Sequence, residues 1–79
     1  DIQDTIDAAK ADMLLCGILE NKIIDTDVLI LRAIKTYCKA EYSYDDKESK
    51  RYRESYEMLR DHLSMSIDYT VVVYNSYSD

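Results

Sequence analysis

Few residues of this sequence could take part in catalysis or bind a metal. His62 is the only imidazole, and it lies between Leu59 and Leu63 of an apolar stripe, so we expect a packing histidine rather than a general base. Cys16 and Cys38 lie far apart in the sequence and form no CxxC motif, which favours two buried, reduced thiols over a metal site. We therefore predict a protein that is not an enzyme, with no catalytic, cofactor-binding or metal-binding residues and no cofactor.

Acidic side chains are abundant but form no recognisable site. The chain has 16 Asp and Glu residues against 10 Lys and Arg residues, which gives a net charge of −6. Asp1, Asp4 and Asp7 could attract Mg²⁺ weakly, yet no loop supplies the carbonyl oxygens of a calcium site. The plain interpretation is a solvated acidic face at the start of a helix, where carboxylates interact favourably with the helix dipole.

Four basic residues lie close together in the second half of the chain, namely Lys47, Lys50, Arg51 and Arg53. A helix carrying them could enter a DNA groove, so a small helical nucleic-acid-binding regulator is an alternative function. Glu48, Glu54, Glu57 and Asp61 offset these charges, and tight binding to phosphates requires clustered Lys and Arg. A solvated helix face is the commoner origin of such a pattern.

Length and composition indicate one small, mainly helical domain. The chain has 79 residues, no proline, Gly17 as its single glycine and 33% charged residues, so it lacks the turn residues of a sandwich or barrel. We expect no membrane segment, because no apolar run reaches the roughly 18 residues that span a bilayer. A domain of this size buries only about 63% of its unfolded surface. A partner or further copies of the chain would therefore help to stabilise it.

Three amphipathic helices are predicted from the apolar periodicity. The first covers residues 2–18, with Ile2, Ile6, Ala9, Met13 and Cys16 on one face. The second begins at Val28 after an Asp25-Thr26-Asp27 cap, and the third begins after Asp45 and ends near Ser64. The chain begins at Asp1 without a methionine, so we expect that a segment has been lost from its start. The predicted fold is a small bundle of three helices, or four with the lost segment.

The second helix is apolar on most of its circumference, with a narrow polar strip of Arg32, Lys35, Thr36 and Lys39. Apolar residues on all sides mean burial on all sides, so we expect other helices of the same chain or of another copy to surround it. Val28 and Leu31 are therefore candidate subunit-interface residues. The basic strip could meet the acidic face of the first helix, in the same chain or in a neighbouring one.

Residues 69–74 carry the strongest strand pattern of the chain, because all of them are β-branched or aromatic. No second run of this kind exists to pair with it, and an unpaired strand leaves its backbone groups without partners. We therefore expect a C-terminal strand or extended arm that pairs outside the monomer, with Tyr69, Val71 and Val73 as candidate interface residues. This divides the chain into a helical domain, residues 1–68, and an arm with a polar tail, residues 69–79.

Three groups of residues, taken in order, resemble the small head-tail connector family of tailed bacteriophages and prophages, whose members are often labelled putative DNA-packaging proteins. They are Ile6-Asp7-Ala8-Ala9-Lys10-Ala11-Asp12, then residues 27–37, and then Tyr56-Glu57-Met58-Leu59 with His62-Leu63-Ser64-Met65-Ser66 and Asp68-Tyr69. The resemblance covers about residues 2–69. The family usually begins with a further short helical segment, which this sequence lacks.

The resemblance implies a non-enzymatic subunit of a closed ring of identical copies, for which twelvefold symmetry is one option. Such a ring would dock below the portal protein, extend the channel for the genome and carry the next tail-joining protein, at the head-tail junction of a virion assembled in the bacterial cytoplasm. A channel lined with carboxylates repels phosphates, so DNA could pass without sticking. The candidate channel-facing residues are Asp1, Asp4, Asp7 and Asp12.

Overall fold

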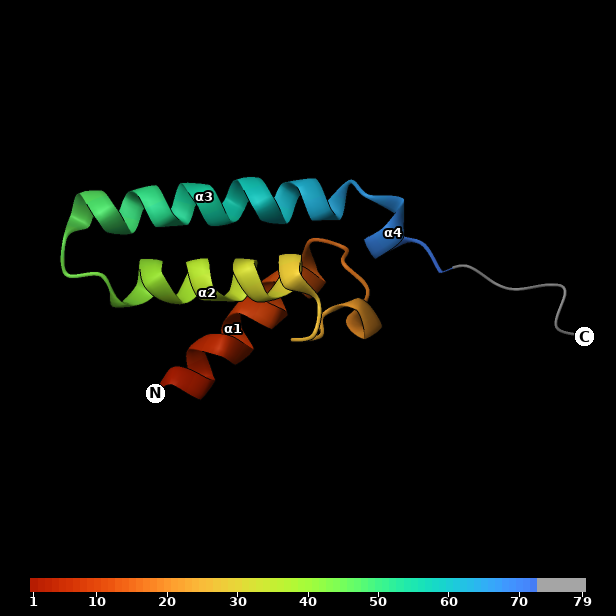
Figure 1. Ribbon diagram of the computed structural model, residues 1–79, viewed down its shortest axis with the longest axis horizontal. Coiled ribbons are helices and arrows are strands. Elements are labelled where there is room, and N and C mark those ends of the chain that lie inside the picture. Colours follow the sequence, from red (N-terminus) through yellow and green to blue (C-terminus); the bar gives the residue numbers. More distant parts are fainter. Residues whose placement is uncertain (73–79) are drawn as a thin grey trace, which may run out of the picture.

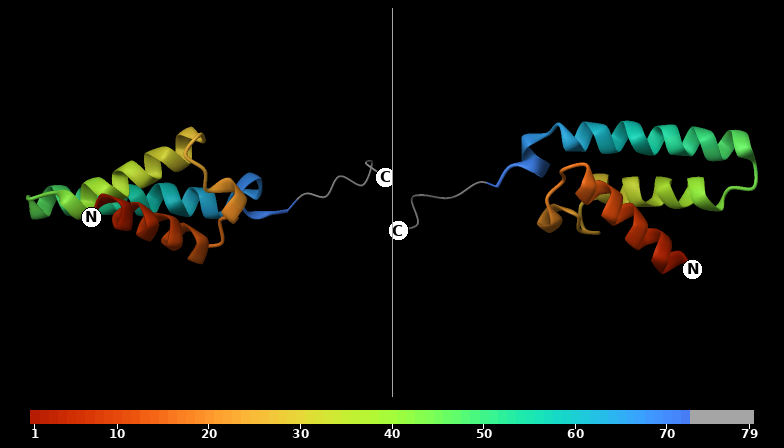
Figure 2. Two further views of the ribbon diagram at one scale, coloured as in Figure 1. Left: turned by 90° about the horizontal axis from the view of Figure 1, so that it is seen from below. Right: turned by 180° about the vertical axis from the view of Figure 1, so that it is seen from behind.

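A computed structural model describes residues 1–72, which form helices joined by short connections. The elements are α1 (Ile2–Leu15), the short 3₁₀ helix η1 (Glu20–Lys22), α2 (Val28–Tyr42), α3 (Asp46–Ser64) and α4 (Ile67–Thr70). Helices α2 and α3 run antiparallel side by side, and α1 crosses α2 obliquely (Figures 1 and 2). The prediction of a mainly helical small bundle is confirmed.

Capping side chains fix where the helices begin. Asp27 accepts hydrogen bonds from the backbone N–H groups of Leu29 and Ile30, at 2.9 and 3.2 Å. Asp45 accepts one from the N–H of Lys47 at 2.9 Å. Each bond satisfies a donor that has no partner within the first helical turn. Both predicted helix starts are therefore confirmed.

Helix α1 ends at Leu15, three residues earlier than predicted, because Gly17 turns the chain. Its φ of +97° is a left-handed conformation that glycine adopts without strain. The N–H of Gly17 donates to the carbonyl of Leu14, and the N–H of Ile18 donates to that of Met13. These two bonds form a Schellman motif, in which the residue after the glycine packs back on the helix. Ile18 accordingly enters the core.

The core lies where α1, α2 and α3 meet. Met13, Ile18 and Ile30 are its largest fully buried side chains. Tyr56 and Leu63 of α3 close it from the other side, and the remaining buried members are Ala9, Ile23, Ala33 and Ile34. The ring of Tyr37 packs edge-on against that of Tyr56, with 5.1 Å between ring centres. Burial of this apolar surface is the main force that holds the three helices together.

Two expectations about single residues are wrong, and one about α2 is met only in part. His62 is exposed rather than packed in the stripe, because the core-facing positions of α3 are Tyr56 and Leu63. The thiols of Cys16 and Cys38 are free but only half-buried. Helix α2 is buried along one side, whereas Val28 at its start is 72% exposed, so a single chain does not surround it.

The predicted strand is wrong at its first two residues, because Tyr69 and Thr70 lie in α4. Ser66 caps this short helix, and the hydroxyl of Thr70 donates to the carbonyl of Ser66 at 2.7 Å. Tyr69 packs against the core, so tertiary contact overrides its local β-propensity. Val71 has an extended backbone. Val73 and the rest of the predicted arm lie outside the described residues, so the boundary between residues 68 and 69 stays a prediction.

Candidate interaction surface

A polar cluster at the edge of the core joins α1 to α3. The hydroxyl of Tyr56 donates to Asp12 Oδ2 at 2.6 Å, and Arg60 Nη1 donates to the same oxygen at 3.0 Å. Arg60 also binds Asp61 through Nε and Nη2, and its guanidinium lies 5.6 Å from the centre of the Tyr56 ring. One carboxylate therefore holds a phenol and a cation from the facing helix.

The electrostatics of this cluster fix its protonation. Burial and the hydrogen bond to Asp12 raise the pKa of Tyr56 strongly, so the phenol stays a donor. Burial alone would lower the pKa of Arg60, but its hydrogen bonds to Asp12 and Asp61 outweigh this and raise the pKa. All charged partners are satisfied here, which is the pattern of a structural contact rather than of a catalytic centre.

A second tyrosine, Tyr69, attaches the short helix α4 to the rest of the fold. The hydroxyl of Tyr69 donates to Asp27 Oδ2 at 2.8 Å, and its backbone carbonyl accepts from the N–H of Leu19 at 2.9 Å. The pKa of Asp27 is raised by burial but lowered more by its hydrogen bonds from Tyr69, Ile30 and Leu29, so the net shift is downward. These bonds hold α4 against the connection between α1 and α2.

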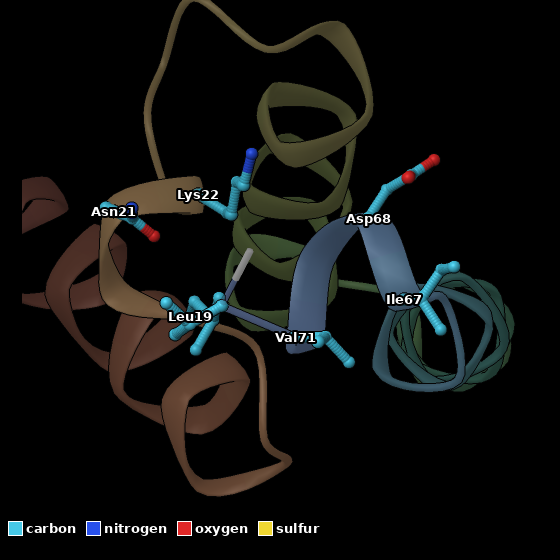
Figure 3. A pocket seen from close by; sticks show the side chains of 7 residues that line it. Leu19, Asn21, Lys22, Ile67, Asp68 and Val71 are labelled. Atoms are coloured by element: carbon cyan, nitrogen blue, oxygen red, sulfur yellow. The ribbon is translucent and has the colours of Figure 1, made fainter. Parts of the chain in front are cut away.

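A groove opens beside this contact, between α4 and η1. Its volume is about 470 Å³, and Leu19, Asn21, Lys22, Ile67, Asp68, Val71 and Val72 line it. Figure 3 shows Leu19, Asn21 and Lys22 on one side of the groove and Ile67, Asp68 and Val71 on the other. Ile67 is 73% exposed and Val71 is 49% exposed. An open groove whose walls include exposed apolar side chains is suited to protein contact.

The four aspartates predicted to face a channel are in different environments. Asp12 is half-buried and holds Tyr56 and Arg60. Asp1 caps α1 by accepting from the N–H of Asp4 at 2.8 Å. Asp4 and Asp7 are exposed. Helix α1 thus presents Asp4 and Asp7 to solvent, whereas the carboxylate of Asp12 is bound within the fold.

The predicted interface residues also differ. Val28 and Val71 are exposed, and Leu31 is half-buried. Tyr69 packs its ring on the core and donates to Asp27, so it already has a role within the chain. Val73 lies outside the described residues. Sequence reasoning missed the groove residues Leu19, Lys22 and Ile67, because they come from two short helices, η1 with its N-cap and α4, whose approach no periodicity reveals.

The basic residues of α3 do not form a uniform cationic surface. Lys50 and Arg53 share a shallow depression with Asp46, Glu54 and Glu57, and Arg51 lies 3.9 Å from Glu48. Phosphate binding gains little from cations that carboxylates already neutralise. The structure therefore adds nothing in favour of the nucleic-acid-binding alternative.

Neither a metal nor a membrane is implied by residues 1–72. In that range no three His, Cys, Asp or Glu side chains are grouped so as to hold an ion. The helices formed by the same residues are too short or too polar to cross a bilayer.

Comparison with known proteins identifies a family for this chain. Neither the curated proteins nor the solved structures give a match to this chain. The family model described as phage connector protein matches residues 1–70, which include α1, α2, α3 and α4. A match over most of the chain shows that this chain belongs to the phage connector protein family.

Proposed function

We propose that this chain is a structural, non-enzymatic subunit of a phage head-tail connector ring, which docks below the portal protein and forms part of the channel for DNA. The family match supports the connector role. The observation that carries the proposal is the groove between α4 and η1, because nothing among residues 1–72 covers its apolar walls. Exposed apolar surface of this kind usually marks a site of protein contact.

Ring formation is supported by the arrangement of the exposed surfaces. Helices α2 and α3 give the subunit a long axis, and the outer faces of α1 and α2 lie along its sides (Figures 1 and 2). Contacts between unlike side surfaces of identical subunits generate closed rings when the rotation between neighbours closes. Such a ring leaves the ends of each subunit free to stack on the next component of the junction.

We assign the portal contact to the end that carries the groove. The last residue of α1, the first of α2 and the whole of α4 lie at this end (Figure 1). Ile67, Val71 and Val72 are exposed there, and Lys22 and Asp68 add one charge of each sign to the groove walls. An apolar centre with a polar rim is the usual anatomy of a protein interface.

The channel role is supported by charge alone. The net charge of −6 disfavours adhesion to DNA phosphates. Asp1 and Asp12 are engaged in a cap and in the core-edge cluster. If α1 faces the channel, Asp4 and Asp7 are therefore the carboxylates that DNA would meet.

The test combines the full chain with the portal protein of the same phage. Electron microscopy and native mass spectrometry should show a ring of copies stacked on the portal. A variant with Ile67→Asp and Val71→Asp should bind the portal at least tenfold more weakly, because two charges would enter the apolar contact. Tyr44→Asp is the matched control, since Tyr44 is fully exposed in the connection at the opposite end of α3.

Two results would contradict the proposal. The first is a chain that associates neither with itself nor with the portal at any concentration. The second is a groove variant that binds the portal as tightly as the control does, which would remove the assignment of the groove. Circular dichroism should show the same helix content in both variants, because every substituted side chain is exposed.

A further inference from the structure

The exposed face of α1 changes character along the helix. At about 100° per residue, six exposed residues fall on one side of it. They are Asp4, Asp7, Ala8, Ala11, Leu14 and Leu15. The first half of this α1 face is acidic and the second half is apolar, and Leu15 is 87% exposed. No element formed by residues 1–72 covers this face.

The exposed face of α2 has the complementary order. Val28 and Leu31 lie at its start, followed by Arg32, Lys35 and Lys39, and these residues line one shallow depression together with Thr36. The first half of this α2 face is therefore apolar and the second half is basic. Val28, Arg32, Lys35 and Lys39 are exposed.

The charges of the two faces are not paired with each other inside one chain. Among residues 1–72, no carboxylate lies within ion-pair distance of Arg32, Lys35 or Lys39. Asp7 accepts a hydrogen bond from Gln3 only, and Asp4 lies 3.7 Å from the terminal amino group. The basic face and Asp7 therefore keep their charge available for a partner, and Asp4 is paired only with the exposed terminal amino group among residues 1–72.

Antiparallel contact would match the two faces along their whole length. Asp4 and Asp7 would then lie opposite Lys39 and Lys35, and Leu15 would lie opposite Val28. Each face extends over eleven residue steps, about 17 Å at 1.5 Å per residue. In this one register the opposite charges would face each other and the apolar groups would also face each other.

We propose that the α1 face of one copy packs antiparallel on the α2 face of the next copy and that this contact repeats around the connector. The inference rests on the proposed function and names the surface by which its subunits associate. The occupant is a second copy, because the same chain carries both complementary faces. The contact joins unlike surfaces, so each copy can bind two neighbours.

This interface and a channel-lining role of Asp4 and Asp7 make opposite predictions for assembly. If the two aspartates line a channel, their replacement by lysine should leave assembly intact and slow the passage of DNA. If they bind Lys35 and Lys39 of a neighbour, the same change should weaken assembly. Binding of DNA to the basic face would instead show as a salt-dependent gel shift that Lys35→Glu abolishes.

Charge reversal provides the test. The acidic-face variant carries Asp4→Lys and Asp7→Lys, the basic-face variant carries Lys35→Glu and Lys39→Glu, and a third variant carries all four changes. Sedimentation of the full chain, alone and with the portal, should show association weakened at least tenfold in each of the first two. In the variant with all four changes, association should recover to within about threefold of the parent, because opposite charges face each other again.

Four exposed residues of α3 supply matched controls. Glu54→Lys with Glu57→Lys, and Lys47→Glu with Lys50→Glu, make the same charge changes outside the two faces and should leave association unchanged. If both face variants assemble like the parent while the portal still binds, the interface is refuted and the connector function stands. If no variant, nor the parent, assembles with or without the portal, both proposals are wrong.

Disulfide trapping does not depend on helix charges and therefore covers the case in which a reversed charge unfolds α1. Cys16 and Cys38 are first replaced by serine, and Leu15→Cys and Val28→Cys are then introduced together. Oxidation of the assembled protein should give a ladder of dimers, trimers and larger species. Each single-cysteine variant should give no ladder beyond a dimer. Absence of the ladder in a protein that assembles would overturn the antiparallel register.

Discussion

Two regions of the molecule use the same pair of residues, a tyrosine hydroxyl on an aspartate, with different results. At the core edge, Tyr56 donates to Asp12 at 2.6 Å and joins α3 to α1. At the groove end, Tyr69 donates to Asp27 at 2.8 Å and joins α4 to the start of α2. The first ring is 3% exposed, whereas the second is half-buried. Each bond connects segments that are far apart in the sequence.

The difference between them lies in what else the aspartate binds. Asp12 also accepts a hydrogen bond from the guanidinium of Arg60. Loss of the Asp12 carboxylate would therefore leave both this cation and a buried phenol without their acceptor. Asp27 also caps α2 through backbone N–H groups, which water can reach when α4 moves away. The core-edge bond therefore supports the whole fold, while the groove-end bond holds one short helix. The proposed partner contact at the groove thus lies beside the weaker of the two contacts, where local opening costs less.

Removing the core-edge carboxylate should have the largest effect on stability. Asp12→Ala leaves the Tyr56 hydroxyl and the Arg60 guanidinium without their shared acceptor, and we expect a loss of about 2 kcal/mol in the free energy of unfolding. For a domain of this size that corresponds to a fall of about 10 °C in Tm. Urea denaturation followed by circular dichroism measures the first quantity and a thermal scan the second.

Asp7→Ala is the matched control for this change, because it removes an exposed aspartate of the same helix. We expect it to alter stability by less than about 0.5 kcal/mol. Equal effects of the two substitutions would show that the core-edge cluster contributes no more than a surface charge. The contrast drawn between the two tyrosine-aspartate pairs would then fail.

The sequence was sufficient for the helical fold because local signals and packing agree there. The cap residues Asp27 and Asp45 and the apolar face of α1 predict elements that the structure confirms. The sequence was insufficient to predict α4, because the β-branched and aromatic residues there suggested a strand. The deciding interactions were the cap at Ser66 and the contacts of Tyr69, and a bond to a residue 42 positions away leaves no local pattern.

The candidate sites were less predictable than the fold. The polar and apolar halves of the α2 face could be read from the sequence, because helical periodicity places Val28 and Lys35 on one side. The role of Asp12 could not, since it was predicted, together with Asp1, Asp4 and Asp7, to face a channel. Only the packing of α1 on α3 turns Asp12 towards Tyr56. The groove likewise exists only because η1 and α4 meet.

Removing each tyrosine hydroxyl separately should give two effects of smaller and unequal size. Tyr56→Phe leaves Asp12 with Arg60, and we expect a loss of about 1.5 kcal/mol, because the hydroxyl binds a charged acceptor beside the core. Tyr69→Phe should cost about 0.5 to 1 kcal/mol, since water can replace the hydroxyl at the half-buried Asp27. Urea denaturation of both variants compares the two regions directly.

Hydrogen exchange shows whether these losses are global or local. Tyr69→Phe should speed exchange at the N–H of Leu19, which donates to the Tyr69 carbonyl, and leave the buried amides of α2 protected. Tyr56→Phe should speed exchange across α1 and α3. Local opening in both variants, or global opening in both, would remove the distinction between a fixed core and a separable groove end.

The smallest effect should appear as acid sensitivity at the groove end. The net downward shift of the Asp27 pKa, from the 3.8 of the unfolded chain, means that the folded protein favours the carboxylate. Its contribution to stability is fully present above pH 3.8 and is lost as the pH falls through the lower folded pKa. Asp27→Asn keeps a capping side chain but cannot ionise, so its stability should fall less steeply than that of the parent between about pH 5 and pH 2.

Asp25→Asn removes a neighbouring exposed carboxylate and controls for the change in net charge. Combining Asp27→Asn with Tyr69→Phe then isolates the bond between the two side chains. The double variant should lose less stability at neutral pH than the sum of the single losses, because either change alone already breaks the same charged hydrogen bond. Full additivity would mean that Tyr69 and Asp27 act independently, and α4 would then be held at the groove by the backbone bond to Leu19 and by apolar contact alone.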